Sequence, residues 1–580
     1  MTHSPVGYFS FVLHSHLPYV LSHGSWPHGT DWLNEATAET YIPILNCINE
    51  CIEQGIQPRL TIGISPVLAE QLDDEAFKAG FDAYLQIKID AALADQKTFK
   101  KQRETELFEL AHWWETIYRG IRRDFVERYQ RDLITEFRRL LNKGYLDIFT
   151  CGATHGYFPL LSQDTSIRAQ VKMAIKCHQR HFGRKPRGIW LPECAYRPRY
   201  AWAPPVDSAI GRRAYPRKGV DEFLSENGIE YFFVDSSTLK GGKAIGVYIA
   251  RFEGLQQLWE QYERAFNPRE EDFEKSCYES YQVNSMPETH QPVSIFARDP
   301  ETGIQVWSGT HGYPGDGWYL DFHKKNFPGG LRYWRVTDSR MDMADKKRYH
   351  PEKIDERLFE NAAHFVGLIK QKLTQYHQSH AGTGFLAAPF DTELFGHWWF
   401  EGIGFIKKVI QRIANDPDIR LATCAEVLDR RHSARLINLP EGSWGEGGYH
   451  FIWLNKDTDW TWIQLYTAEM RMQMLARSTN HRQDEKVGKI VRQAARELML
   501  AQASDWQFLI TTRSAADYAE TRFSKHIADF NRLADMAENY ERKKALPPDD
   551  WEFLERCQMR DALFPDIDIE WFASVELPAI

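Results

Sequence analysis

The stretch APFDTELFGHWWFEG, Ala388 to Gly402, ends an apolar run and continues into a dense group of polar and aromatic side chains. The run, residues 385–390, has the length and composition of a buried β-strand. Two carboxylates, Asp391 and Glu393, follow it directly. Acids beside aromatic rings are typical of sugar sites, because carboxylates act as acid, base or nucleophile and indole faces stack on pyranose rings. A strand end followed by a capped helix with core aromatics would give the same pattern.

A second segment of similar composition favours the catalytic interpretation. In IWLPECAY, residues 189–196, an apolar run delivers one isolated carboxylate, Glu193, between Trp190 and Tyr196. Pro192 fixes the backbone immediately before that acid. Two strand ends that each present one acid match the needs of glycoside chemistry, in which one carboxylate attacks the anomeric carbon and the other protonates the leaving oxygen.

The composition restricts the class of partner. The chain has 580 residues, enough for about three or four domains or for an α/β barrel with insertions. Its net charge of −9 argues against a nucleic-acid or anionic-membrane partner, since both usually need a basic face. The 19 Trp, 25 Tyr and 34 Phe exceed what packing alone would predict, and a polysaccharide binder would use the excess as platforms.

Cysteine usage and hydropathy give an expectation about location. The eight cysteines form no metal-type CxxC pair, so we expect a reducing, cytoplasmic environment. The N-terminal apolar run has no basic leader, and no segment approaches 18 uninterrupted apolar residues, so we expect no secretion signal and no membrane span. We also expect a monomer.

Two histidines follow the first expected strand, residues 8–13. His14 and His16 are two residues apart on an extended chain and so share one face, which points them into one pocket at the carboxyl edge of the sheet. They could be metal ligands, hydrogen-bond partners of sugar hydroxyls, or structural histidines. Trp32, in the next loop, is expected to line the same pocket.

The pattern of apolar strand, polar residue and helix recurs along the chain, as in parallel βα units. His155 and Tyr157 follow an expected strand at 146–151, and Asp235 follows one at 229–234. Further strands are expected at 59–65 and 304–307. The sequence therefore predicts an α/β fold in which polar side chains gather at one edge of the sheet.

Three regions depart from this pattern. Residues 67–143 are densely charged with helical apolar spacing and predict an inserted helical subdomain, so that the barrel comprises 1–66 and 144–426. Residues 241–292, rich in tyrosine, predict either an active-site loop with short helices or a disordered insertion. Residues 427–580 predict a helical C-terminal domain that covers one end of the barrel. Ser504 would cap one of its helices, and Asp505 would reach the pocket.

Five motifs together resemble the five sequence regions of glycoside hydrolase family 57. They are HSHLPY from His14, ATHGY from Ala153, WLPECAY from Trp190, FDTELFGHWW from Phe390 and LPEGSW from Leu439. The forms WLPECAY and FDTELFGHWWFEG are more similar to the family's 1,4-alpha-glucan branching enzymes than to its amylases or 4-alpha-glucanotransferases. Segments similar to SDWQFLITT and YAETR extend the resemblance almost to the end of the chain.

The resemblance implies an incomplete (β/α)7 barrel with an inserted helical subdomain, a helical C-terminal domain, and a retaining mechanism without metal or cofactor. It implies that Glu193 is the nucleophile and Asp391 the acid/base, acting on an alpha-glucan. The residues expected to bind substrate, from the motifs and from the strand ends, are His14, His16, Trp32, His155, Tyr157, Trp190, Asp235, Trp307, His397, Trp399, Trp444, Trp453 and Asp505. The 241–292 segment is longer than the corresponding loop of the family, where a tyrosine at the tip supports branching.

Two other classes of protein remain open at this stage. A metal-dependent carbohydrate hydrolase or deacetylase would use His14, His16 and a carboxylate as ligands. A glucan-binding protein without activity would keep the tryptophans. Within the family, an alpha-amylase or a 4-alpha-glucanotransferase is the main alternative to a branching enzyme.

Overall fold

The computed structural model describes residues 4–25, 27–208, 211–241, 251–266, 271, 273–309, 311–430 and 435–573. Its centre is a nine-stranded sheet in the order β10-β1-β2-β3-β4-β7-β9-β8, with β11 beside β1. The strands of this sheet are β1 Gly7–Ser15, β2 Leu60–Ile64, β3 Leu146–Cys151, β4 Gly188–Trp190, β7 Tyr231–Val234, β8 Tyr281–Val283, β9 Val293–Ala297, β10 Gly384–Asp391 and β11 Ile419–Leu421.

The seven strands from β10 to β9 are parallel, and β8 pairs antiparallel with β9. In the described residues β10 and β8 do not pair, so the ring stays open, although the amide of Phe385 donates to the carbonyl of Tyr278 at 2.9 Å across the gap. The predicted α/β class and incomplete seven-stranded barrel are confirmed.

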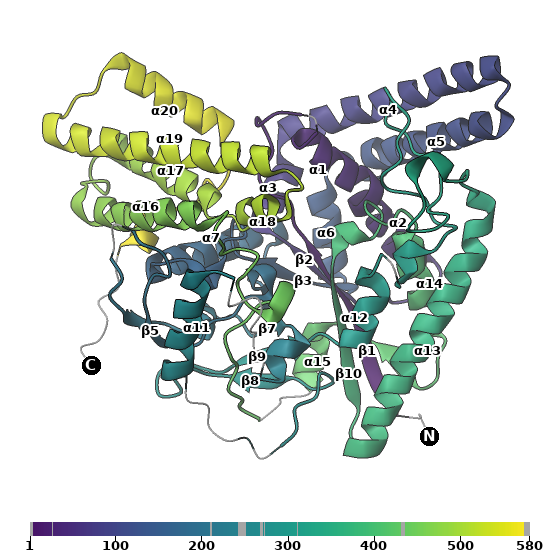
Figure 1. Cartoon of the computed structure of the whole chain (residues 1–580), viewed down its shortest axis with the longest axis horizontal. Coiled ribbons are helices and arrows are strands. Elements are labelled where there is room, and N and C mark those ends of the chain that lie inside the picture. Colours follow the sequence, from purple (N-terminus) through teal and green to yellow (C-terminus); the bar gives the residue numbers. More distant parts are fainter. Residues whose placement is uncertain are drawn as a thin grey trace.

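Helices surround this barrel and form a projection on each side of its upper end (Figure 1). A small hairpin of β5 Tyr200–Trp202 and β6 Tyr215–Arg217 lies outside the main sheet. The helices around the barrel are α1 Thr30–Ala36, α2 Ile42–Glu53, α3 Pro66–Asp73, α6 Leu133–Asn142, α7 Asp164–Phe182, α8 Val220–Glu226, α9 Ser236–Leu239, α11 Glu253–Ala265, α12 Pro300–Trp307, α13 Ile354–His380, α14 Gly402–Ala414 and α15 Cys424–Arg430.

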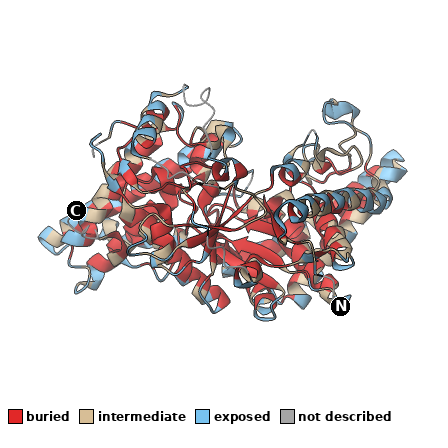
Figure 2. Cartoon of the chain, turned by 90° about the horizontal axis from the view of Figure 1, so that it is seen from below, coloured by how far each residue is buried: buried red, intermediate tan, exposed pale blue. Residues whose placement is uncertain are grey.

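One projection is the pair α4 Glu75–Gln102 and α5 Thr105–Arg123, which pack along each other (Figure 1). The other contains α16 Asp459–Ser478, α17 Glu485–Ala501, α18 Asp505–Thr512, α19 Ala516–Lys543 and α20 Pro548–Arg560. The outward faces of the projections are largely exposed, whereas the strands are buried (Figure 2). None of the helices in the described part of the chain has the length and hydrophobicity needed to cross a membrane.

Side-chain alternation on the strands determines which residues face the inside of the barrel. Val12, Phe149, Trp190 and Phe385 belong to one core cluster, the barrel interior, whereas their neighbours along the strands pack outward against helices. Because successive side chains on a strand point to opposite faces, His14 shares the inward direction of Val12. By the same alternation Asp391 continues the inward row that begins at Phe385.

The prediction of a strand at residues 304–307 is wrong. Those residues end the helix α12, and the seventh parallel strand is β9, eleven residues earlier in the sequence at its start. The Asp299 side chain accepts a hydrogen bond of 2.8 Å from the amide of Thr302, and Pro300 occupies the first turn. An acidic cap followed by proline is a strong helix start, and it overrides the apolar run Ile304 to Trp307.

The described parts of the 241–292 segment are ordered elements. They contain α11 and β8, and the side chains of Tyr262 and Tyr281 are buried in the core. Tyr278 donates a hydrogen bond of 2.8 Å to Asp299. These three tyrosines therefore serve packing, and Tyr248 lies outside the described residues.

Candidate active site

Glu193 sits in a backbone conformation that side chains rarely adopt. It follows β4 in the short turn Pro192–Cys194, with φ +62°, and Cys194 also has positive φ. Strain of this kind costs about 1–3 kcal/mol per residue and persists where the surroundings hold the residue in place. The peptide carbonyl of Glu193 accepts a hydrogen bond of 3.1 Å from the amide of Trp444, which is one such restraint.

The carboxylate of Glu193 is held at both oxygens. Trp444 Nε1 donates to Oε2 at 2.9 Å, and Ser504 Oγ donates to Oε1 at 3.0 Å. Its side chain is 13% exposed, and burial raises its pKa to about 7, against the two hydrogen bonds, which lower it. The group is thus oriented and poised near neutrality.

The pKa of Asp391 is also raised, well above its ordinary value. Burial is the main cause, and the nearby carboxylates of Glu393 and Glu193 add to it, while Arg298 opposes it. Asp391 lies opposite His14 in the register of β10 and β1. An environment that keeps one carboxyl protonated while another ionises separates the acid from the nucleophile.

Glu393 is a positioning group in this arrangement. Its Oε1 accepts hydrogen bonds from the hydroxyl of Tyr41 at 2.5 Å and from the amide of His16 at 3.1 Å. Burial raises the pKa of Glu393 to about 7. The carboxylate therefore ties the end of β1 to the segment that follows Asp391.

The three predicted histidines form one stack. The ring centroids of His16 and His155 are 4.0 Å apart, and those of His14 and His155 are 5.2 Å apart. His14 Nε2 and His155 Nε2 share a hydrogen bond of 3.1 Å, and His155 Nδ1 pairs with Ser504 Oγ at 2.8 Å. His16 Nε2 lies 3.0 Å from Asp505 Oδ2. Burial lowers the pKa of His14 and of His155 well below the usual value, so both rings are neutral at pH 7.

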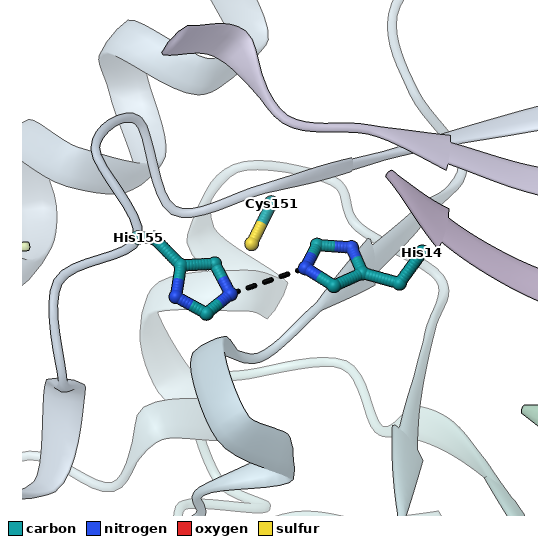
Figure 3. A group of neighbouring side chains, drawn as sticks. All are labelled: His14, Cys151 and His155. Carbon is teal, nitrogen blue, oxygen red and sulfur yellow. Dashed lines mark hydrogen bonds between the residues drawn. The ribbon is translucent and has the colours of Figure 1, made fainter. Parts of the chain in front are cut away.

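These histidines also have the spacing of possible metal ligands. The donor atoms of His14, Cys151 and His155 lie within 4.8 Å of one another, and Figure 3 shows the thiol beside the hydrogen bond that joins the two rings. Those of His16, His155 and Asp505 form a second such group. The nitrogen that each ring turns toward its neighbours already takes part in a hydrogen bond. By contrast, the buried His14 Nδ1 has no hydrogen-bond partner among the described residues.

Arg298 is a site residue that the sequence interpretation missed. It follows β9 and forms an ion pair of 2.5 Å with Asp235, whose other oxygen caps α9 through the amide of Ser237. Its guanidinium lies 5.7 Å from the ring centroid of Trp444. Asp235 therefore holds a cation near Asp391 and does not itself face open space, since it is 9% exposed.

The loop after Leu439 adds an aromatic wall beside Glu193. Trp444 packs edge-on against Trp190 at 5.0 Å and against Trp307 at 5.9 Å. Trp307 is 38% exposed, whereas Trp453 is 1% exposed and stacks on the buried Tyr157 at 4.5 Å. Trp307 can thus present a face to a ligand, while Trp453 and Tyr157 support the wall from behind.

Three other predicted binding residues are placed differently from expectation. Trp32 lies in α1 and packs against the core instead of lining a loop. Trp399 is 2% exposed and belongs to the core. His397 is buried 3.6 Å from Glu39, which forms an ion pair of 2.7 Å with Arg332. The exposed ring of this segment is that of the adjacent Trp398.

The predicted role of Ser504 as a helix cap is also wrong. Ser504 precedes α18 as predicted, but it makes no side-chain cap, and its hydroxyl serves His155 and Glu193. Asp505 reaches the pocket as expected. Arg298 directly follows the strand β9. If residues 293–297 are recognised as a strand, Arg298 is predicted as a further polar residue at a strand end.

Models of known families match two parts of the chain. The glycosyl hydrolase family 57 model matches residues 10–440, which contain Glu193, Asp391 and the histidine stack. The model of the C-terminal region of 1,4-alpha-glucan branching enzymes matches residues 464–572, which contain Ser504 and Asp505.

Individual relatives extend along almost the whole chain. A 1,4-alpha-glucan branching enzyme from Thermococcus kodakarensis is 38% identical over 575 residues, 99% of this chain and 80% of that protein. The crystal structure of a branching enzyme from Pyrococcus horikoshii matches with a TM-score of 0.87 at 37% identity, over 99% of this chain and 98% of that one. An alpha-amylase from Thermotoga maritima matches with a TM-score of 0.79 at 28% identity, over 98% and 100% of the two chains. Since the family model spans most of the chain and these relatives share its fold from end to end, this protein belongs to glycosyl hydrolase family 57.

Proposed function

We propose that this chain is a 1,4-alpha-glucan branching enzyme that acts by retaining double displacement without a metal or cofactor. The observation that carries the proposal is the environment of Glu193, whose carboxylate is held at both oxygens by Trp444 and Ser504. It lies near a second carboxyl, Asp391, whose pKa is also raised. The relatives from Thermococcus and Pyrococcus bear the name of this activity.

In the first step Glu193 attacks C1 of an α-1,4-linked glucose. The bond from C1 to the leaving oxygen breaks as Asp391 gives its proton to that oxygen, so a covalent glycosyl ester and a shortened chain result. In the second step Asp391, now ionised, takes the proton of an acceptor 6-hydroxyl. The hydroxyl oxygen attacks C1 and releases Glu193, which forms the α-1,6 branch with retained configuration. This mechanism requires the two carboxyls to be roughly 5 to 5.5 Å apart.

The two pKa directions support these roles. The pKa of Asp391 is raised well above its ordinary value, which favours the protonated form that a general acid needs, while Glu193 ionises near pH 7 and can attack. The histidine stack, in which His14 and His155 are neutral, would orient sugar hydroxyls. The positive charge of Arg298 near Asp391 would stabilise that carboxylate in the second step.

The proposal assigns a role to each part of the chain. We infer that residues 1–66 and 144–426 form the catalytic domain, that 67–143 are inserted into it, and that 427–580 complete the site with Trp444, Ser504 and Asp505. The ligand is then an alpha-glucan such as amylose or a glycogen-type polysaccharide, and the working unit is a monomer, which gel filtration at micromolar concentration tests.

Hydrolysis is the second candidate outcome, because the Thermotoga relative is named an alpha-amylase. Incubation with amylose, followed by debranching and analysis of chain lengths, separates the two. New side chains that appear only after debranching support the proposal. Reducing ends without new branches would make the chain an amylase, and chains redistributed in length without branches would make it a 4-alpha-glucanotransferase.

A further inference from the structure

We propose that Trp398 and Phe322 form a second sugar-binding platform, which the inserted helices α4 and α5 hold in place. This inference rests on the proposed action on alpha-glucan and adds a binding subsite to it. Among the described tryptophans only Trp307 and Trp398 are largely exposed, with 38% and 50% of their surfaces open. Trp307 belongs to the wall beside Glu193, whereas Trp398, the more exposed ring, is not part of that wall.

Trp398 is tied to the catalytic region by its backbone. Its amide donates a hydrogen bond of 3.1 Å to the carbonyl of Glu393, whose side chain receives the amide of His16. Glu393 in turn contributes to the raised pKa of Asp391. Trp398 therefore lies in the segment that follows Asp391 and Glu393, whereas Trp307 ends α12.

The exposed indole is part of an ordered stack. The ring of Phe322 lies 4.4 Å from that of Trp398 with an interplanar angle of 25°, and it meets the ring of His397 edge-on at 5.5 Å. A large exposed ring that is immobilised by a second ring loses little freedom on binding. Flat aromatic surfaces of this kind fit the C–H faces of pyranose rings.

The loop that carries Phe322 is fixed by an acidic residue at its start. The buried Asp321 accepts hydrogen bonds from the amides of His323 and Lys324 at 2.9 and 2.7 Å and pairs with Lys346. This turn sets the direction of Phe322, so the stack is built into the loop and does not depend on a ligand.

The inserted helices support the same loop farther along. Asp95 of α4 accepts hydrogen bonds from Asn326 at 3.0 Å and from the hydroxyl of Tyr333 at 2.8 Å. Trp114 of α5 donates to the carbonyl of Arg332 at 2.6 Å. In Figure 1 the helix pair projects on the side away from the C-terminal helices. The insertion thus has a function beyond a solvated surface, which is to position one wall of the glucan cleft.

The ligand that this platform fits is a neutral α-1,4-glucan chain continuing from the candidate site. Lys325 lies 5.9 Å from the ring centroid of Phe322 and pairs with Glu35 at 3.5 Å, so charged groups of both signs lie beside the rings. Such groups exchange hydrogen bonds with sugar hydroxyls, while the rings cover the apolar faces.

The test measures binding of maltoheptaose by isothermal titration to the Glu193→Gln chain, in which turnover should be slower by several orders of magnitude. Added Trp398→Ala or Phe322→Ala should each weaken binding about threefold to tenfold. Trp398→Tyr should recover most of the loss because it keeps a ring. The matched control is Phe359→Ala, since Phe359 is an aromatic residue of α13 that is 56% exposed.

Unchanged affinity in Trp398→Ala, or an equal loss in the Phe359 control, would overturn the platform. If the parent chain itself fails to bind maltoheptaose, the ligand class is wrong and the proposed function falls with the platform. If the parent binds and the variants bind weakly, but the wild-type chain makes no branches, the platform stands and only the branching activity fails.

Discussion

The indole nitrogen of Trp444 donates a hydrogen bond of 2.9 Å to a carboxylate oxygen of Glu193, 251 residues earlier in the chain. The amide of the same tryptophan bonds the carbonyl of the same glutamate at 3.1 Å. One residue of the C-terminal part therefore restrains the backbone of the proposed nucleophile and also stabilises the ionised form of its side chain. The barrel alone would leave Glu193 without these two hydrogen bonds.

The first prediction concerns the charge that Trp444 stabilises. Trp444→Phe keeps a ring but removes the donor, so the pKa of Glu193 should rise above about 7, because a hydrogen bond to the ionised form lowers it. We expect the acidic limb of the kcat/KM profile to move up by about one pH unit. Initial rates of amylose cleavage between pH 5 and 9 measure the shift.

Trp460→Phe is the matched control for this variant. The Trp460 indole also donates a hydrogen bond, at 3.1 Å, but to the peptide carbonyl of Asp457. Its profile should superpose on that of the wild type. An unshifted limb in Trp444→Phe would mean that the bond does not control ionisation of Glu193.

The second prediction is that kcat/KM of the unaltered chain is bell-shaped. Below about pH 7 Glu193 is protonated and cannot attack, so the rate should fall tenfold for each further pH unit. The basic limb should appear where Asp391 loses the proton that it gives to the leaving oxygen, well above the usual titration range of an aspartate. A profile that is flat from pH 5 to 7 would contradict the assignment of Glu193.

The third prediction uses the two isosteric variants. Glu193→Gln and Asp391→Asn keep the shapes of the side chains but each removes one step of the displacement, so turnover should fall by several orders of magnitude. Circular dichroism should show a native fold. Retention of more than about a tenth of the wild-type rate by either variant would show that its residue has another role.

The strand ends illustrate what the sequence could predict. His14, His155, Glu193 and Asp391 all follow apolar runs, and parallel strands bring their carboxyl ends together, so a shared site followed from the pattern. The sequence pattern could not show, however, that the exposed ring is that of Trp398 and not that of Trp399, which is predicted to bind substrate. Adjacent residues at a turn point in different directions, and composition does not distinguish the exposed ring from the buried one.

The position of Ser504 shows a second limit. A serine before a helix predicts a cap, yet its hydroxyl contacts Glu193 and His155, which are 311 and 349 residues away. Contacts over such separations depend on how the C-terminal helices pack against the barrel, which the local sequence around Ser504 does not determine. The seventh strand was missed for a different reason, because two short apolar runs, 293–297 and 304–307, compete and only the Asp299–Pro300 helix start separates them.

The fourth prediction concerns metal. Because the facing nitrogens of the histidine stack already share hydrogen bonds with Ser504, Asp505 and one another, we expect prolonged EDTA treatment to leave activity unchanged. Metal analysis of the purified chain accompanies the assay. Loss of activity on chelation, with recovery on addition of zinc, would instead favour ligation at one of the two groups that include His155.

The last prediction concerns the choice between branching and hydrolysis, which is made after the glycosyl ester forms. Water at about 55 M and an acceptor hydroxyl then compete for one carbon, and the acceptor must be held at a high effective concentration to win. Trp307 is suited to this role because it is exposed and packs against Trp444, and in the described part of the chain it makes no hydrogen bond to Glu193 or Asp391. Its loss should therefore spare donor cleavage.

We therefore expect Trp307→Ala to raise the ratio of new reducing ends to new branches on amylose by about threefold to tenfold while total cleavage changes little. Trp444→Ala should lower both products, since it also removes the partner of Glu193. The Phe359→Ala chain gives the reference ratio. If Trp307→Ala leaves the ratio unchanged and only slows the reaction, Trp307 binds the donor, and selection of the acceptor lies elsewhere in the cleft.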